Sequence, residues 1–538
     1  MSAQQGEVLH DAATYDDKKA QPSVEVNEVG SGKKSTIKIG KELGPVALIF
    51  ACGTALFSDG YINAASGPVK TILGVLYEDR NPNLSHDLSL FSSLAFAGTV
   101  AGMLIFGVLT DRIGRKPGML FCCIWLTLWS IIIAGAWGAG GSIPGLFAAL
   151  QAYRFLQGIA LGAEYPCGSV AASENTEAPG VNPKHTQSLF ILATNTAIDF
   201  GFVAASLVAA ILLEIFSERH LEWVWRLTLG LGALPPMIIF FFRTRMHEPE
   251  QFKKGAIKKP TAKLWWLIIK KYWVRLSAVS LSWFIYDWVS YPAGLYSSFF
   301  VSQLVPDNDL QISLWYGVLI NAFYIPGTII GALLSDRLGP KNTMILGLFI
   351  QAAFGFGLAG GFGALRNESI AGIIVLYGFF VAAGEMGPGN NLGLLASKAV
   401  APTAVRGTFY GIAAAIGKVG AFVATYVYDQ IQADLSPDEM ATIRFSGPFY
   451  IGAGLALVSA AIVFVFIPQV THDGMKKLDR DFEAYLVANG YDLSFMGMES
   501  TSAPEKIEDV KDTESPQEEK EGIGADAERE QARRQTEA

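Results

Sequence analysis

The sequence predicts an all-α membrane protein with twelve transmembrane helices in two six-helix, pseudo-symmetric halves. Three observations support this fold class: apolar runs long enough to span a bilayer, positive charge concentrated on one side of those runs, and one loop motif that occurs twice in register. Of the 538 residues, 51% are hydrophobic and only 17% are charged. Charged residues make up about a quarter of a soluble domain, so the composition argues against a soluble protein.

The apolar runs divide the chain into its predicted parts. Each run is at least as long as the ~20 residues that a helix needs to cross the hydrocarbon core. The twelve runs lie near 45–67, 89–110, 117–138, 145–171, 187–213, 222–243, 273–303, 311–335, 341–362, 371–396, 406–428 and 446–468. We predict a disordered N-terminal tail (1–40), a first half (41–243), a linker (244–272), a second half (273–468) and a mostly disordered C-terminal tail (469–538). Within this last tail, residues 473–490 are expected to form a short amphipathic helix.

Basic residues mark one side of the membrane as cytoplasmic. The segment between the sixth and seventh runs carries Arg243, Arg245, Lys253, Lys254, Lys258, Lys259, Lys263, Lys270 and Lys271. Glycosylation sequons at Asn83 and Asn367 fall on the opposite side. An even number of spans places both termini on the basic side, so we expect both tails to be cytoplasmic. The first 40 residues are polar, so no cleavable signal peptide is expected.

One loop motif follows both the second and the eighth runs. Its two copies are Gly107–Lys116 (GVLTDRIGRK) and Gly331–Lys341 (GALLSDRLGPK). We expect charged side chains of these loops to form contacts that break and re-form as the two halves rock. The candidates are Asp111, Arg112, Arg115, Asp336 and Arg337. The repeated motif resembles the signature loop of the major facilitator superfamily, which implies that fold and a substrate site near the middle of the membrane.

Lys418 lies in the middle of the eleventh apolar run. A lone ammonium in hydrocarbon is unfavourable, so the side chain is expected to face a protein interior or a cavity. In the seventh run, Trp283, Asp287 and Tyr291 are spaced by four residues and therefore share one helix face. This pattern is typical of a polar binding stripe, although an aromatic packing stripe with a satisfied carboxylate would look the same. A buried cation and a buried acid together indicate a carrier for an anion.

Other polar residues inside the apolar runs are further candidates. They are Asp59, Arg154, Glu164, Tyr165, Asn195, Asp199, Glu385, Asn390 and Asn391. Arg154 is expected to pair across helices with Asp59 or Glu164, either in a proton path or as a structural pair. Glu385 precedes Pro388 and either belongs to the site or supports a broken helix.

These residues resemble motifs of the phosphate:proton symporter branch of the superfamily. The matching segments are Gly162–Pro166, the Trp283–Asp287–Tyr291 stripe, Gly387–Asn390 and Gly417–Gly420. The resemblance implies that Tyr165, Trp283, Asp287, Tyr291, Asn390 and Lys418 contact phosphate, with Asn195 at the position of a family Gln. It implies a proton path through Asp59, Arg154, Glu164 and Asp287. Two positions depart from the pattern: Ile62 replaces a second first-helix acid, and Glu164 replaces an Asp.

Over residues 40–490 the chain resembles the fungal glycerophosphoinositol permeases. The resemblance implies a plasma-membrane symporter that imports glycerophosphodiesters such as glycerophosphoinositol and glycerophosphocholine together with protons. Asp199, Glu385 and Asn391 are the candidates for headgroup contacts. An inorganic phosphate:proton symporter and a non-transporting nutrient sensor remain the alternatives. The sequence contains no nucleophile–His pair and no cluster of metal ligands, so we expect no enzyme activity, cofactor or metal. We also expect no nucleic-acid partner. The expected partners are substrate, protons and membrane lipid.

Overall fold

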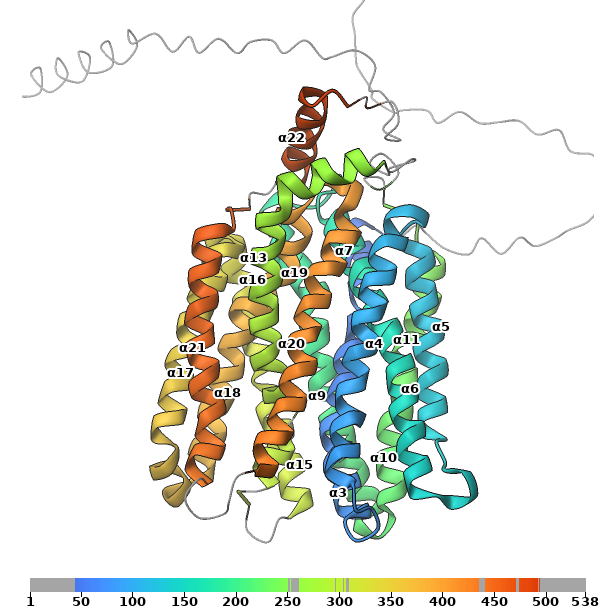
Figure 1. The fold of residues 1–538 in the computed structure, drawn as a ribbon, viewed down its shortest axis with the longest axis vertical. Coiled ribbons are helices and arrows are strands. Elements are labelled where there is room, and N and C mark those ends of the chain that lie inside the picture. Colours follow the sequence, from blue (N-terminus) through green and yellow to red (C-terminus); the bar gives the residue numbers. More distant parts are fainter. Residues whose placement is uncertain are drawn as a thin grey trace, which may run out of the picture. The chain divides into compact units, whose positions relative to one another are not determined.

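The computed structural model describes residues 44–249, 252, 261–295, 297–302, 304–305, 309–434, 441–470, 474–491 and 493. The predicted N-terminal tail and the C-terminal tail beyond 493 lie outside these residues. Within them, the chain folds into a bundle of long helices, viewed from the side in Figure 1.

The first half of the bundle consists of six helical rods, several of them broken. Their helices are α1 (Pro45–Gly53), α2 (Leu56–Ala64), α3 (Ser66–Tyr77), α4 (Leu84–Ile113), α5 (Arg115–Ala134), α6 (Ile143–Glu164), α7 (Val170–Thr176), α8 (Thr186–Ala193), α9 (Asn195–Phe216), α10 (Leu221–Gly230) and α11 (Leu234–Thr244). A π-helical turn, η2 (Tyr165–Ser169), joins α6 to α7.

The second half repeats this plan. Its helices are α13 (Ala262–Leu295), α14 (Ser297–Ser302), α15 (Leu310–Ala322), α16 (Tyr324–Leu338), α17 (Pro340–Glu368), α18 (Ile370–Gly384), α19 (Asn390–Leu395), α20 (Arg406–Asp434) and α21 (Ala441–Phe466). Two π-helical turns, η7 (Glu385–Gly389) and η8 (Ala396–Val400), flank α19. Helix α22 (Gly474–Ala488) follows the last rod.

Ten of these rods, among the described residues, are long and apolar enough to cross a membrane. The other two predicted spans are also helical, over 143–176 and from α13 into α14. Both carry buried charged groups, among them Arg154, Glu164 and Asp287. The prediction of twelve helical spans is therefore confirmed. The seventh span begins at Ala262, inside the predicted linker.

The two copies of the loop motif make the same turn. Gly114 separates α4 from α5 with φ of 106°, and Gly339 separates α16 from α17 with φ of 80°. Both values lie in the region that glycine adopts without steric penalty. The repeat seen in the sequence therefore corresponds to a repeated backbone conformation, with one copy in each half.

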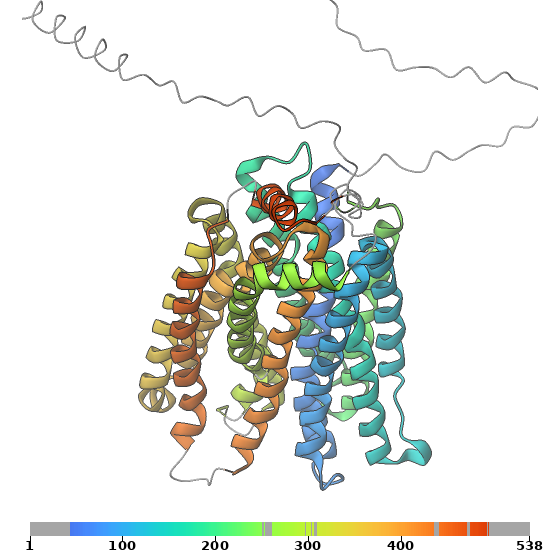
Figure 2. The same cartoon turned by 45° about the horizontal axis from the view of Figure 1, so that its top comes forward.

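The halves meet along a seam of long helices. Helix α4 of the first half packs along α20 of the second, and α13 packs along the other side of α20, as the central helices of Figure 1 show. Helix α22 lies across the end of the bundle at which α13 begins (Figure 2). Its apolar side chains Met475, Leu478, Phe482 and Leu486 are buried there. The predicted amphipathic helix is present, and it is docked.

Candidate functional site

A cavity with an empty volume of about 690 Å³ lies between the two halves. Its walls come from α2, η2, α8 and α9 in the first half and from α13, α16, η7, α19 and α20 in the second. Two of these elements, η2 and η7, contain Pro166 and Pro388. Proline removes a backbone donor and breaks regular helix geometry, and π-helical turns of this kind are frequent at functional sites. The turns bring Tyr165 and Glu385 to the cavity wall.

Lys418 lines this cavity and is only 1% exposed. Its ammonium lies 3.2 Å from Oδ2 of Asp287 and donates a hydrogen bond to the hydroxyl of Tyr291. It also lies 3.8 Å from the ring centroid of Tyr291 and 5.2 Å from that of Tyr165. An ammonium over an aromatic face is stabilised by the ring quadrupole. The cation is thus held by an acid and two tyrosines at the edge of an open space.

The predicted stripe on the seventh span, Trp283, Asp287 and Tyr291, lines the same cavity. The Trp283 ring packs edge-on against Tyr410, with centroids 5.6 Å apart, and obliquely against Tyr165 at 6.4 Å. Phe96 packs edge-on against Tyr291 at 5.0 Å. The stripe therefore combines aromatic packing with a polar face toward the cavity, so the two sequence interpretations describe two sides of one structure.

A second polar group in the cavity centres on Asn195. The Asn195 amide nitrogen lies 2.8 Å from Glu385, 3.0 Å from Oδ1 of Asn390 and 3.3 Å from Asp199. Glu385 also accepts a hydrogen bond from Tyr286. Asn390 is fixed by α16, because its amide donates to the Thr328 carbonyl at 2.8 Å. The cavity thus has a cationic group around Lys418 and an acidic group around Asn195.

Asp59 is fully buried but does not line the cavity. It accepts hydrogen bonds from the Tyr165 hydroxyl at 2.8 Å and the Asn63 amide at 2.9 Å. Tyr165 does line the cavity, so Asp59 lies one hydrogen bond behind its wall.

The expected pairing of Arg154 was wrong. Its guanidinium contacts Ser66, the Ile62 carbonyl at 3.1 Å and Gln157 at 3.0 Å, and it forms no ion pair with an acid in the described part of the chain. Glu164 instead pairs with Arg243, which is fully buried, although the sequence analysis counted it among the basic cytoplasmic residues between the sixth and seventh runs. Arg243 also donates to the Cys52 carbonyl at 2.7 Å and the Met119 carbonyl at 3.0 Å. The end of α11 therefore turns into the bundle, which spacing along one helix could not reveal.

Asn391 does not reach the cavity, contrary to its assignment as a headgroup contact. Its amide donates to the Gly387 carbonyl at 2.7 Å, and its oxygen accepts from Ser335 at 2.8 Å. Sequence reasoning also missed cavity residues, notably Tyr286, Ser290 and Tyr324. The first two follow Trp283 by three and seven residues, a helical spacing that could have placed them on the same side.

The loop motifs join the two halves at the α22 end of the bundle. Asp111 accepts hydrogen bonds from the backbone amides of Gly407 at 3.0 Å and Thr408 at 2.7 Å, at the start of α20. Asp336 does the same at the start of α8, accepting from Gln187 at 3.1 Å and Ser188 at 3.0 Å. A carboxylate at a helix N-terminus satisfies free amides and complements the helix dipole. Each half thus caps a helix of the other.

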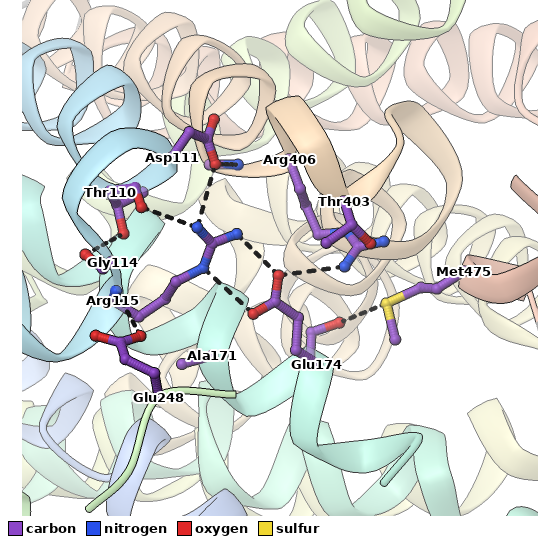
Figure 3. A network of polar contacts seen from close by, with 12 residues as sticks. Thr110, Asp111, Gly114, Arg115, Ala171, Glu174, Glu248, Thr403, Arg406 and Met475 are labelled. Carbon is purple, nitrogen blue, oxygen red and sulfur yellow. Dashed lines mark hydrogen bonds and ion pairs between the residues drawn. The ribbon is translucent and has the colours of Figure 1, made fainter. Parts of the chain in front are cut away.

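A buried ion network stands beside the Asp111 cap (Figure 3). Glu174 of α7 accepts from Arg115 at 3.2 and 2.9 Å, and Arg406 of α20 reaches the same carboxylate at 3.3 Å. All three side chains are fully buried at their charged ends. Arg112 and Arg337, the other loop candidates, are exposed. These contacts close this end of the bundle between the halves.

Comparison with known proteins agrees with this architecture. The profile of the Major Facilitator Superfamily matches residues 48–425. The chain is 42% identical over 453 residues to the Major glycerophosphoinositol permease GIT3 of Candida albicans, covering 83% of each chain. It is 43% identical over 451 residues to the Glycerophosphocholine permease GIT4 of the same organism, again covering 83% of each.

A solved structure, the proton:xylose symporter XylE, superposes with a TM-score of 0.68 at 16% identity and covers 81% of this chain and 98% of that one. At that identity the likeness concerns the fold alone. Sequence profile, relatives and fold agree: this chain is a multi-pass membrane transporter, not an enzyme, and belongs to the Major Facilitator Superfamily, in the same family as the fungal glycerophosphoinositol permeases.

Proposed function

We propose that this transporter imports glycerophosphodiesters across the plasma membrane together with protons, with both of its termini in the cytoplasm. The observation that carries the proposal is the composition of the cavity. One wall offers a cation and hydroxyl donors, which suit a phosphate group, and another offers two carboxylates and two amides. The permeases to which the chain is similar carry names that specify such substrates.

The phosphodiester binds at Lys418. A phosphodiester carries one negative charge at neutral pH, and Lys418 is the buried cation on the cavity wall. Tyr165 and Tyr291 add neutral donors within the same group. The headgroup lies against the Asn195 group, where Asp199, Glu385 and Asn390 accept hydrogen bonds from a polyol or face the positive charge of a choline.

Proton coupling follows from a competition for Lys418. In the structure the Lys418 ammonium is paired with Asp287 at 3.2 Å. When a phosphodiester binds, it forms the ion pair with Lys418 in place of Asp287. The Asp287 carboxylate would then be buried without a partner. An unpaired buried charge costs several kcal/mol, so the carboxyl takes up a proton instead. Anion and proton therefore favour each other's binding, and this linkage is reciprocal.

The proton reaches Asp287 from the side of Asp59. Tyr165 donates to Asp59 at 2.8 Å and stands next to the Lys418 group, which makes it the connection between the two acids. The sequence also assigns Glu164 and Arg154 to the proton path. Glu164 is held by Arg243 and Arg154 by neutral partners, so Asp59 and Asp287 are the acids that we place in the path.

The test is uptake of labelled glycerophosphoinositol into proteoliposomes under an imposed pH gradient. We expect accumulation against a concentration gradient only when the outside is more acidic, and inhibition by glycerophosphocholine at lower concentrations than by inorganic phosphate. Lys418→Ala abolishes uptake, whereas the exposed-lysine control Lys270→Ala retains it. Preferred uptake of phosphate would establish the alternative phosphate symporter, and no flux of either solute would establish a sensor.

A further inference from the structure

Two carboxyl groups on the wall of the central cavity, those of Asp199 and Glu385, have no counter-ion. Asp199 of α9 is 2% exposed and Glu385 of η7 is 7% exposed, and both line the cavity. Among the described residues, the cavity wall carries one cation, Lys418, and it is paired with Asp287 at 3.2 Å. Buried charges in proteins are normally paired or neutralised. The two carboxyl groups therefore need a positive charge from another source.

The hydrogen bonds around Asn195 leave this pair of acids one hydrogen short. The Asn195 amide nitrogen has two hydrogens. Three oxygen acceptors surround it, at 2.8 Å on Glu385, 3.0 Å on Asn390 and 3.3 Å on Asp199. Reversing the Asn195 amide would place its oxygen against the same three acceptors, so the shortage does not depend on its orientation. A proton on one of the two carboxyl groups supplies the missing hydrogen.

The neighbouring titratable groups do not supply a counter-ion. Those that face the pair from the helices packed around it are Tyr286, Asp287, Tyr324 and Lys418 on the cavity wall and Asp59 behind it. Tyr286 donates a hydrogen bond to Glu385 and is neutral. Asp287 and Lys418 neutralise each other. A proton is therefore the charge that balances one carboxylate of the pair.

We propose that Asp199 and Glu385 hold one exchangeable proton between them, and that the headgroup of the substrate decides whether this proton stays. The inference rests on the proposed function, in which the headgroup lies against these residues. A neutral polyol headgroup exchanges hydrogen bonds with the pair and leaves the proton in place. A quaternary ammonium headgroup brings a fixed positive charge and displaces the proton to the solution from which the substrate entered. Phe202, Tyr286 and Tyr324 add aromatic surface to the same cavity, and aromatic faces attract such cations.

This exchange changes the number of protons carried but not the net charge. Each choline-bearing substrate releases one proton outside when it binds, and the pair regains one proton from the cytoplasm after the substrate leaves. Glycerophosphocholine is a zwitterion, whereas glycerophosphoinositol carries one negative charge. Import of glycerophosphocholine therefore carries one proton fewer per molecule than import of glycerophosphoinositol, and both substrates move the same net charge.

Proton exchange is measured by calorimetric titration of the purified full chain in two buffers that differ in ionisation enthalpy. The difference between the two heats gives the number of protons released per ligand bound. We expect glycerophosphocholine to release about one proton more than glycerophosphoinositol. Both ligands contain the phosphodiester, so the proton taken up at Asp287 cancels in this comparison. For the same reason, the ratio of the two affinities should shift about tenfold per pH unit toward glycerophosphocholine as the pH rises.

Asp199→Asn tests the assignment of the proton to this pair. The variant leaves Glu385 with the donors of Asn195 and Tyr286, so no proton remains to be displaced. We expect the difference in released protons to fall from about one to about zero, and the affinity ratio to lose its pH dependence. The matched control Glu218→Gln, at an exposed acid outside the cavity, retains both effects.

The possible outcomes separate this inference from the proposed function. Equal proton release by the two ligands in the parent chain overturns the inference and leaves the proposed function standing. An undiminished difference in the folded Asp199→Asn chain has the same meaning, and so does binding of glycerophosphoinositol without binding of glycerophosphocholine. If neither ligand binds the parent chain, the proposed function fails and the inference fails with it. The parent titration decides the matter even where the variant does not fold.

Discussion

Replacing Lys418 by methionine leaves the carboxylate of Asp287 buried without its partner. The two groups are 3.2 Å apart and 2% or less exposed. At this separation, and with an effective dielectric constant of about 20, Coulomb's law gives an attraction of about 5 kcal/mol. Removing one member of a buried pair typically costs about 3–5 kcal/mol. We therefore expect Lys418→Met to lower the free energy of unfolding by about 3–5 kcal/mol at neutral pH.

The pH dependence separates the two single variants. In mildly acidic buffer the lone carboxylate of the Lys418→Met protein takes up a proton, so the loss of stability becomes smaller. Asp287→Asn leaves the ammonium without its partner and no carboxyl to protonate at this position, so its loss of stability is not relieved in the same buffer. The double variant Lys418→Met/Asp287→Asn removes both charges and is expected to be close to the parent, because neutral replacement of a buried pair is often well tolerated.

The assay is denaturant unfolding of the parent, both single variants and the double variant in detergent micelles, completed by uptake measurements. Lys270→Met, at an exposed lysine of the same protein, is the matched control. The reasoning predicts strong non-additivity, with a coupling energy of about 3 kcal/mol or more. If the effects of the two single variants add to within ~0.5 kcal/mol of the double variant, the pair is not coupled, and the proton-exchange mechanism built on it fails.

Other predictions concern the rest of the site and the contacts at the α22 end. The Asn195 side chain contacts both Glu385 and Asp199. We expect Asn195→Ala to raise the KM for glycerophosphoinositol about tenfold through loss of this hydrogen-bonding group, and to change inhibition by inorganic phosphate little. An equal change for both anions would contradict the assignment of the headgroup to this part of the cavity. Glu164→Gln leaves Arg243 unpaired and should destabilise the protein by about 3 kcal/mol; retained proton-driven accumulation in the folded variant would exclude Glu164 from the proton path. Asp111→Asn and Asp336→Asn each weaken a helix cap by about 1 kcal/mol, seen as faster hydrogen exchange in the first turns of α20 and α8 respectively; unchanged exchange would show that the caps do not hold the halves together. Burial raises the pKa of Glu177 above its ordinary value, so the folded protein disfavours the ionised carboxyl, and the stability that the protonated form contributes is lost as the pH rises through the raised pKa. We therefore expect Glu177→Gln to stabilise the protein in alkaline buffer but not in acidic buffer. An equal change of the thermal unfolding temperature in both buffers would contradict this.

The sequence was a good guide wherever one helix carries the information. The length of the apolar runs predicted the spans, and the four-residue spacing of Trp283, Asp287 and Tyr291 correctly placed them on one wall. The lone lysine at 418 required a polar environment, and the structure provides it. The repeat of the loop motif is also matched by positive φ angles at both Gly114 and Gly339.

The sequence was a poor guide wherever two helices must meet. The partner of Glu164 lies 79 residues away at Arg243, and no periodicity connects them. Arg154 looked like a counter-ion because acids lie in neighbouring spans, but its helix turns it toward Ser66 and Gln157. Asn391 follows Asn390 directly, yet adjacent residues on a helix point in different directions, so only Asn390 reaches the cavity. The helical register between spans decides these contacts, and it depends on packing.

The two equivalent helix caps, one from each half, have a consequence for how the protein changes conformation. Asp111 and Asp336 each bind the amides of the second and third residues of their target helices. Because the attachment points are related by the internal duplication, we expect a rotation of one half against the other to separate both carboxylates from their amides together. Breaking one cap alone would not allow the halves to move apart, so we expect both caps to break in one concerted transition and not one after the other.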